Sequence, residues 1–207
     1  MRQLWLASGS PRRLLMLEEA GFQPHRARFD VDDDSLVEAV GGVDAACLAR
    51  AWFKACAAVS ALSRIAGSEG RSVSEGVVLA ADTLCASEGR LIGKPGDDRE
   101  AMAMIGELAG RTHRTVTGVA IIDLRDDSRS IWSDATVVRI GPLDDDTIKD
   151  YVASGEWKGK SGGYNLADRI AAGWTIEVDG DPSTVMGLPM RKLEPQLRGL
   201  LEGGGSA

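Results

Sequence analysis

The sequence is poor in the residues that form metal clusters, disulfide frameworks and nucleophilic triads. It contains two histidines and three cysteines among 207 residues. Cys47, Cys56 and Cys85 are odd in number and widely spaced, without a Cys-x-x-Cys pair, so neither a disulfide framework nor a zinc site is expected. His25 and His113 are too few and too far apart for a histidine metal site or a Ser-His-Asp triad. Any chemistry must therefore depend on carboxylates and cations.

Positive charge and long apolar runs are also scarce. The formal net charge is −7, which argues against broad binding to nucleic acid or to an anionic membrane. No apolar run approaches the roughly 20 residues that span a bilayer, and the N-terminus lacks the regions of a signal peptide. We therefore expect a cytoplasmic protein, in which any positively charged site is local.

The patterns that are present predict an α/β fold with a mixed sheet. Hydrophobic residues make up 43% of the chain, enough for a sizeable core. We expect one domain over residues 1–202 and a disordered Gly/Ser tail over residues 203–207. The elements follow from apolar periodicity and capping residues. Strands are predicted at 4–6, 27–31, 77–83, 112–124, 130–140 and 174–178, helices at 11–20, 43–65, 98–109 and 145–153 and from 182 on, and a flexible loop at 67–76.

The segment Ser8-Gly-Ser-Pro-Arg-Arg13 places two arginines at the start of a predicted helix. Ser10 fits an N-cap and Pro11 fits the first helical position. The first turn of a helix has free N–H groups and the positive end of the macrodipole, so it disfavours Arg12 and Arg13. A bound phosphate would resolve the conflict, with hydrogen bonds from the Ser8 and Ser10 hydroxyls, the amides and the guanidinium groups. The alternative is a solvated helix start with both arginines on its outer face.

One carboxylate and two lysines could complete such a site. Asp82 ends an apolar run, and ligands of open α/β sheets collect at the carboxyl ends of strands. Lys54 lies in the middle of a predicted helix, and Lys94 precedes a proline in extended backbone. Each residue also has a purely structural explanation, because Asp82 could cap a turn and the lysines could cover apolar surface or decorate a loop.

The order of these segments resembles the Maf family of nucleoside triphosphate pyrophosphatases. The resemblance covers almost the whole chain, and no single piece of it is specific. It is carried by Ser8-Gly-Ser-Pro-Arg-Arg13, Ala51-Trp-Phe-Lys-Ala55, Ala81-Asp-Thr-Leu84, Gly93-Lys-Pro95, Leu108-Ala-Gly-Arg-Thr-His113, Thr117-Gly-Val119, Ser154-Gly-Glu156, Gly162-Gly-Tyr164 and Val185-Met-Gly-Leu-Pro189.

This resemblance implies an elongated Maf/ITPase-like fold, with a mixed twisted sheet flanked by helices and a central cleft between two lobes. It implies cleavage of nucleoside triphosphates between the α and β phosphates, giving a monophosphate and pyrophosphate, in a house-cleaning role. It also implies a divalent cation, Mg²⁺ or Mn²⁺ with Co²⁺ as a further candidate, and a homodimer. The alternative is a nucleotide-binding regulator of cell division that does not hydrolyse its ligand.

The resemblance also implies roles for individual residues. The catalytic residues would be Asp82, as the base, with Lys54 and Lys94. The metal ligands would be Asp34 and Asp82. The positions that bind substrate would be Ser8, Ser10, Arg12, Arg13, Thr83 and Ala167, of which Arg12 and Thr83 match positions linked with a preference for dTTP and UTP.

The chain departs from the family pattern at two places. Asp34 stands where the family usually has Glu, and Asp32 or Asp33 could be the ligand instead. Ala167 stands where the dTTP/UTP branch has Gln, so no amide is available there to pair with a pyrimidine edge. Asp168 could supply a displaced acceptor. The preference for a base therefore stays open between dTTP/UTP and a broader range.

Overall fold

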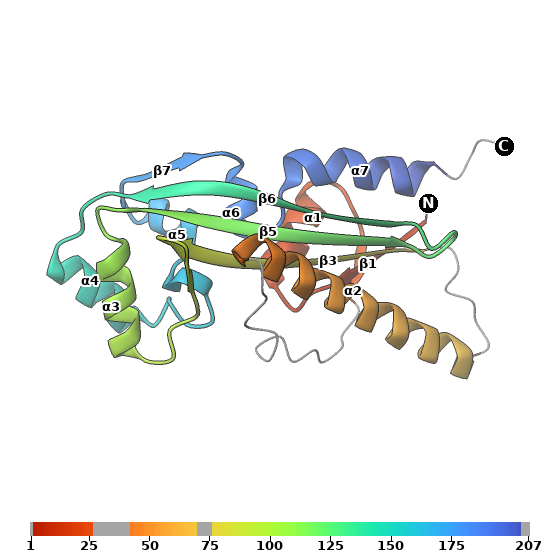
Figure 1. Cartoon of the computed structure of the whole chain (residues 1–207), viewed down its shortest axis with the longest axis horizontal. Helices are drawn as coiled ribbons and strands as arrows, with labels where there is room; N and C mark the ends of the chain where they lie inside the picture. Colours follow the sequence, from red (N-terminus) through yellow and green to blue (C-terminus); the bar gives the residue numbers. More distant parts are fainter. Residues whose placement is uncertain (1, 27–41, 70–75, 204–207) are drawn as a thin grey trace.

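The computed structural model describes residues 2–26, 42–69 and 76–203. These residues form an elongated molecule around one mixed seven-stranded sheet (Figure 1). The strand order is β2-β1-β3-β5-β6-β7, and β4 also pairs with β3. The strands are β1 (Gln3–Ala7), β2 (Pro24–Arg26), β3 (Gly76–Ser87), β4 (Arg90–Ile92), β5 (Thr112–Asp123), β6 (Arg129–Ile140) and β7 (Ile176–Asp179).

Helices flank this sheet, as the sequence predicts for an α/β fold. They are α1 (Pro11–Glu19), α2 (Gly42–Glu69), α3 (Asp98–Leu108), α4 (Asp145–Ser154), α5 (Leu166–Ala171), α6 (Pro182–Met186) and α7 (Met190–Glu202), with a short 3₁₀ turn at Ser161–Gly163. Pairing of β1 with β2 and β3 is parallel, and the other pairs are antiparallel. The predicted mixed sheet is therefore confirmed.

One edge of β3 has a gap in its pairing, and this gap positions the site. β5 pairs with β3 along nearly its whole length, so β1 and β4 must share the other edge. Pairing of β3 with β1 reaches only as far as Ala80, the partner of Ala7. Pairing of β3 with β4 starts at Cys85, the partner of Ile92. The edge of β3 from Ala81 to Leu84 therefore faces neither strand. Asp82 lies in the middle of β3, not at its carboxyl end as predicted, because pairing with β4 and β5 extends the strand to Ser87.

The two faces of β3 carry different hydrophobic clusters, because side chains alternate along a strand. Val77, Leu79 and Ala81 pack with Leu17 of α1 and with Leu193 of α7. Val78 and Ala80 pack instead against buried alanines of α2 at positions 51, 55 and 58. Figure 1 shows α2 and α7 on opposite sides of the sheet at one end, with α3 and α4 at the other end. Asp82 follows the alternation of Val78 and Ala80 and so faces α2.

Helix α2 differs from the expectation that no segment is long and apolar enough to span a membrane. Its residues 42–64 are long and apolar enough, by length and composition, to cross a membrane. The alanines at positions 51, 55 and 58 are fully buried in the cluster with β3 and β5. This packing is that of a core helix of a folded domain.

Other differences from the sequence predictions are local. The helix predicted at 43–65 continues to Glu69, so the first residues of the predicted 67–76 loop are helical. Helix α5 was not predicted at all, because six residues give too few turns for a periodic pattern. The strand predicted at 27–31 lies outside the described residues, and β2 ends just before it at Arg26. All but the first residue of the predicted 203–207 tail also lies outside them.

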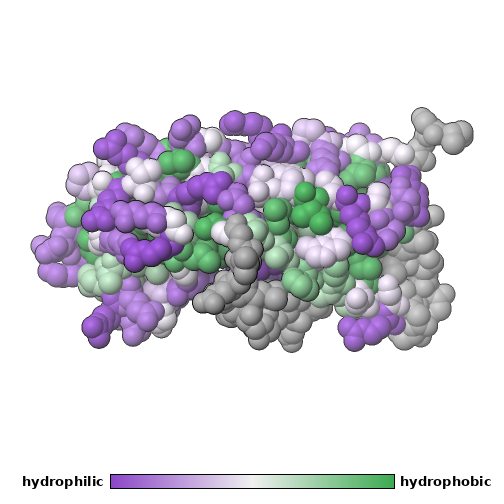
Figure 2. All heavy atoms as spheres, in the orientation of Figure 1, coloured by the Kyte–Doolittle hydropathy of each residue, from purple (hydrophilic) through white to green (hydrophobic). Residues whose placement is uncertain are grey.

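The surface is polar over most of the face that Figure 2 draws. Hydrophilic side chains predominate at the end formed by α3 and α4, and apolar groups emerge between them nearer the centre. Single exposed apolar residues, such as Met102 and Ile170, are normal on the surface of a folded protein.

We expect His113 to make stability depend on pH. Its side chain is 2% exposed, its Nε2 lies 2.7 Å from the Tyr164 hydroxyl, and burial lowers its pKa to about 4. The unfolded histidine titrates near pH 6.5, so the unfolded chain takes up the proton first as pH falls. The free energy of unfolding should therefore decrease by roughly 3 kcal/mol between about pH 6.5 and pH 4.

Urea unfolding at pH 7, 6, 5 and 4 measures this contribution. His113→Gln is the comparison. Glutamine does not titrate over this range, so the free energy of unfolding of this variant should decrease less. Parallel pH profiles for the two proteins would contradict the prediction.

Candidate active site

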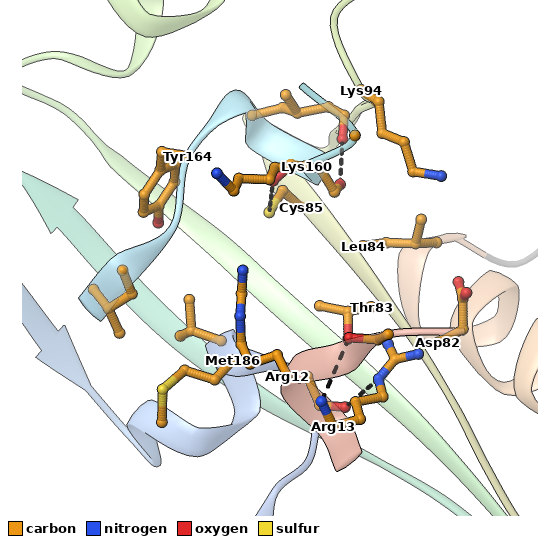
Figure 3. A pocket seen from close by; sticks show the side chains of 18 of the residues that line it. Arg12, Arg13, Asp82, Thr83, Leu84, Cys85, Lys94, Lys160, Tyr164 and Met186 are labelled. Carbon is orange, nitrogen blue, oxygen red and sulfur yellow. Dashed lines mark hydrogen bonds between the residues drawn. The ribbon is translucent and has the colours of Figure 1, made fainter. Parts of the chain in front are cut away.

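A cavity of about 580 Å³ opens at the gap along β3. Figure 3 shows Arg12 and Arg13 on one wall and Lys94 and Lys160 on the opposite wall, with Asp82 and Thr83 of β3 between them. The lining residues are Ser10, Arg12, Arg13, Arg50, Lys54, Asp82, Thr83, Leu84, Cys85, Leu91, Ile92, Gly93, Lys94, Gly159, Lys160, Ser161, Tyr164, Leu166, Val185, Met186 and Gly187. They come from the start of α1, from α2, β3, β4 and the segment just after it, from the glycine-containing loop before α5 and the first residue of α5, and from the end of α6.

Asp82 is held by two cations of α2. The Nζ atom of Lys54 lies 2.5 Å from Asp82 Oδ1, and an NH group of Arg50 lies 3.8 Å from Asp82 Oδ2. The carboxylate side chain is 10% exposed. Its Oδ2 atom accepts no hydrogen bond from the described residues. This oxygen is itself buried, and its recorded contact is the ion pair with Arg50.

The sequence analysis missed Arg50. It lies four residues before Lys54, so the two side chains share one face of α2 one turn apart. That spacing is the signal that could have found it, since a helix that presents Lys54 to a carboxylate also presents Arg50. Arg50 is 8% exposed, and an arginine is rarely buried to this extent unless it has a charged partner, which here is Asp82.

Arg13 is buried and held at three points. Its Nε donates to the Gly187 carbonyl at 2.9 Å, and its two NH groups donate to Ser8 Oγ at 3.1 Å and to Thr83 Oγ1 at 3.0 Å. Ser10 is the N-cap of α1, as predicted, and its Oγ accepts from the Arg13 amide at 3.4 Å. Ser8 does not itself line the cavity. It contacts the site through Arg13.

Three further cations face the cavity. Arg12 and Lys94 do so as the sequence suggested, while Lys160, from the loop between Gly159 and Tyr164, was not anticipated. Burial lowers the pKa of Lys160, and the nearby positive charge of Arg12 acts in the same direction. Among the described residues the lining has six cationic side chains and one carboxylate. The cavity is therefore strongly positive inside a protein whose net charge is −7.

Besides Ser8, one predicted site position is described but does not line the cavity, and another lies outside the described residues. Ala167 is exposed on α5 and is absent from the lining, where its neighbour Leu166 is found instead. Asp34 lies outside the described residues, as do Asp32 and Asp33. Within the described part of the chain no group of three or more His, Cys, Asp or Glu residues could hold a metal ion.

Comparison with protein families decides the relationship. The family described as Maf-like protein matches residues 3–200. The chain belongs to the Maf family. Its curated relatives include a dTTP/UTP pyrophosphatase of Salinibacter ruber, 35% identical over 196 residues, which cover 94% of this chain and 89% of that protein.

Other relatives of the Maf chain agree in length and in name. A dTTP/UTP pyrophosphatase of Symbiobacterium thermophilum is 36% identical, with 93% of this chain and 91% of that protein covered. One of Aromatoleum aromaticum is 38% identical, with coverage of 91% and 90%. The solved structure of a HAM1 protein from Coxiella burnetii is 15% identical, has a TM-score of 0.49, and covers 95% of this chain and 98% of its own.

We expect Gly187→Ala to displace Arg13. Gly187 has a φ of +114°, which an L side chain rarely adopts, and an added Cβ would lie 3.0 Å from Arg13 Nε. The Gly187 carbonyl is also an acceptor for that Nε. The variant should be less stable by about 1–3 kcal/mol and should bind an anionic ligand more weakly. Urea unfolding and calorimetric titration with inorganic tripolyphosphate measure the two effects.

Gly199→Ala is the control, because Gly199 is exposed in α7, is not part of the cavity lining, and nothing lies within 4 Å of its added Cβ. Its tripolyphosphate affinity should match that of the wild type. Unchanged affinity in Gly187→Ala as well would show that Arg13 keeps its place without this glycine.

Proposed function

We propose that this protein hydrolyses nucleoside triphosphates between the α and β phosphates, releasing a nucleoside monophosphate and pyrophosphate. The observation that carries the proposal is a cavity of about 580 Å³ whose described lining residues include six cations and one carboxylate, in a member of the Maf family. Its volume is in the range of pockets that hold small ligands. The excess of cations suits a triphosphate, which carries several negative charges.

The cations position the phosphates and stabilise the charge of the leaving group. Phosphoryl transfer is accelerated chiefly by such positioning and charge stabilisation. Arg13 is held rigidly, so it presents its guanidinium at a fixed place and loses little side-chain freedom on binding. Arg12, Lys94 and Lys160 extend from the cavity walls and neutralise the rest of the triphosphate. Pyrophosphate then leaves as an anion stabilised by the same groups.

Asp82 is the general base of the proposed reaction. It is the one carboxylate among the described lining residues, and its Oδ1 is oriented by Lys54 at 2.5 Å. Asp82 lines the cavity, where its carboxylate would take the proton of the attacking water. Lys54 and Arg50 keep the carboxylate in place.

A divalent cation, Mg²⁺ or Mn²⁺ with Co²⁺ as a further candidate, completes the proposal. Such ions take oxygen ligands, and the unbonded Asp82 Oδ2 is an oxygen of that kind. Asp82 would hold the ion together with Asp34 and oxygens of the substrate. When bound, the ion neutralises phosphate charge.

We further propose a preference for dTTP and UTP, the substrates named for the curated relatives. Arg12 and Thr83 line the cavity at the positions that the family resemblance links with this preference. Ala167 supplies no base contact. The apolar part of the lining, which includes Leu166, Val185 and Met186, would instead contact the base.

Incubation of the protein with a panel of nucleoside triphosphates and Mg²⁺, Mn²⁺ or Co²⁺ tests the proposal. Pyrophosphate and monophosphate are measured separately, and we expect equal amounts of both, with the highest rates for dTTP and UTP. Orthophosphate with a nucleoside diphosphate would contradict α–β cleavage. Tight nucleotide binding without any product would favour the non-hydrolytic regulator.

A further inference from the structure

A row of three threonines connects Arg13 to helix α6 along one face of the sheet. Thr83 Oγ1 accepts from Arg13 at 3.0 Å and lies 2.8 Å from Thr117 Oγ1. Thr117 Oγ1 lies 2.7 Å from the carbonyl oxygen of Thr184 in α6. Thr83 and Thr117 are directly opposite partners of β3 and β5, so the sheet itself sets their contact.

The proton positions along this row follow from counting donors. A carbonyl oxygen has no proton, so the bond to Thr184 must use the single hydroxyl proton of Thr117. Thr117 then has no proton for Thr83, and Thr83 must donate to Thr117. The hydroxyl proton of Thr83 therefore points away from the cavity, and its oxygen is turned toward Arg13 as an acceptor.

The far end of the row is anchored as well. The Thr184 hydroxyl donates to Asp134 Oδ2 of β6 at 2.6 Å, and Asp134 is ion-paired with Lys192 of α7. Thr117 and Thr184 are fully buried. Neither residue lines the cavity. The hydroxyl groups of the row reach the cavity through Thr83 and Arg13.

We propose that Thr117 is a positioning residue, which fixes the Arg13 guanidinium for the triphosphate by holding Thr83 as an acceptor. The inference rests on the proposed function. Without Thr117 the Thr83 hydroxyl is free to rotate and present its proton to Arg13, which is itself only a donor. The bond between them is then lost in part of the population, and Arg13 loses one of the three anchors described above.

Kinetics of Thr117→Val and Thr117→Ser with dTTP test the proposal. Valine keeps the shape and removes the hydroxyl, while serine restores it. We expect kcat/KM to fall about 10- to 30-fold in Thr117→Val, as loss of a buried hydrogen-bond relay predicts, and to stay close to wild type in Thr117→Ser.

Thr136→Val is the matched control for a purely structural effect. Thr136 is also fully buried, and its hydroxyl also donates to a backbone carbonyl beside α6, that of Asp181 at 3.0 Å. It has no part in the row that leads to Arg13. We expect its kcat/KM to stay within about twofold of wild type. Equal losses in Thr117→Val and Thr136→Val would overturn the proposal.

A double-mutant cycle separates action through Arg13 from any other action. In an Arg13→Lys background the planar guanidinium is absent, so Thr117→Val should lower kcat/KM much less than it does in the wild type. An undiminished loss in that background would overturn the proposal. Should Thr117→Val fail to fold, Thr83→Val interrupts the same row at a partly exposed position, and the same comparison between backgrounds decides.

Binding of inorganic tripolyphosphate, measured by calorimetry, separates this proposal from the proposed function. If the wild type releases no pyrophosphate from any nucleotide, the proposed function fails. Tripolyphosphate should still bind about tenfold more weakly to Thr117→Val than to Thr136→Val, because Arg13 is less well fixed. Equal affinities of the two variants would overturn the role of Thr117 whatever the enzyme hydrolyses.

Discussion

Replacement of Asp82 by Asn is expected to abolish most pyrophosphate release while the protein stays folded. An amide of nearly the same size cannot take a proton from water, and loss of a general base lowers rates by about 10²- to 10⁴-fold. The change also removes the one negative charge among the described lining residues. Triphosphate affinity should therefore be equal to or higher than that of the wild type. Pyrophosphate assays and calorimetric titration with dTTP measure the two effects.

This division between turnover and affinity makes the result specific. Loss of the fold would lower both, and circular dichroism with a thermal melt checks for it. Asp145→Asn, an exposed change of the same charge on α4, should leave both unchanged. Turnover at the wild-type rate in Asp82→Asn would exclude Asp82 as the base. The described lining residues include no second carboxylate that could replace it.

Among the variants proposed, Gly118→Ala is expected to lower the free energy of unfolding the most. A Cβ at this position would lie 2.5 Å from the carbonyl carbon and oxygen of Cys47 and 2.8 Å from the amide nitrogen of Leu48. These are backbone atoms of α2, so no rotamer change relieves the overlap. The helix must move away from β5, at a cost of about 3 kcal/mol or more. Urea unfolding measures it.

The same change should impair the site, because Gly118 is the strand partner of Asp82. Displacement of α2 there moves Arg50 and Lys54 away from the carboxylate. Gly106→Ala is the control, since Gly106 is exposed in α3 and its Cβ would meet nothing within 4 Å. That variant should gain about 0.5–1 kcal/mol. Similar stability changes in the two variants would show that α2 does not rest on Gly118.

The N-termini of helices could be predicted because their signals are local. Ser10, Asp97, Asp144 and Asp181 each cap a helix with a side-chain oxygen that accepts from an amide two or three residues later. Such bonds form within a few residues of the chain and depend little on tertiary packing. At Asp97 the Glu100 carboxylate also accepts from Gly96 N–H, one residue before the cap.

The end of β3 could not be predicted in the same way. The run from Val77 to Thr83 is apolar and signals a strand, but Leu84 to Ser87 belong to it only because β4 and β5 pair with them. This longer strand changes the meaning of Asp82. Asp82 lies at the gap between β1 and β4, which pair with the same edge of β3. The extent of each pairing depends on tertiary structure.

The sequence by itself determined the mixed α/β architecture, the helix starts and the candidate residues Arg12, Arg13, Lys54, Asp82 and Lys94, because periodicity, capping and motif order are written in neighbouring positions. Tertiary structure alone decided that Lys160 joins them and that Ala167 stays outside. It also set the threonine row behind Arg13. These features depend on which strands pair and where each ends, and pairing between residues far apart in the chain leaves no local pattern.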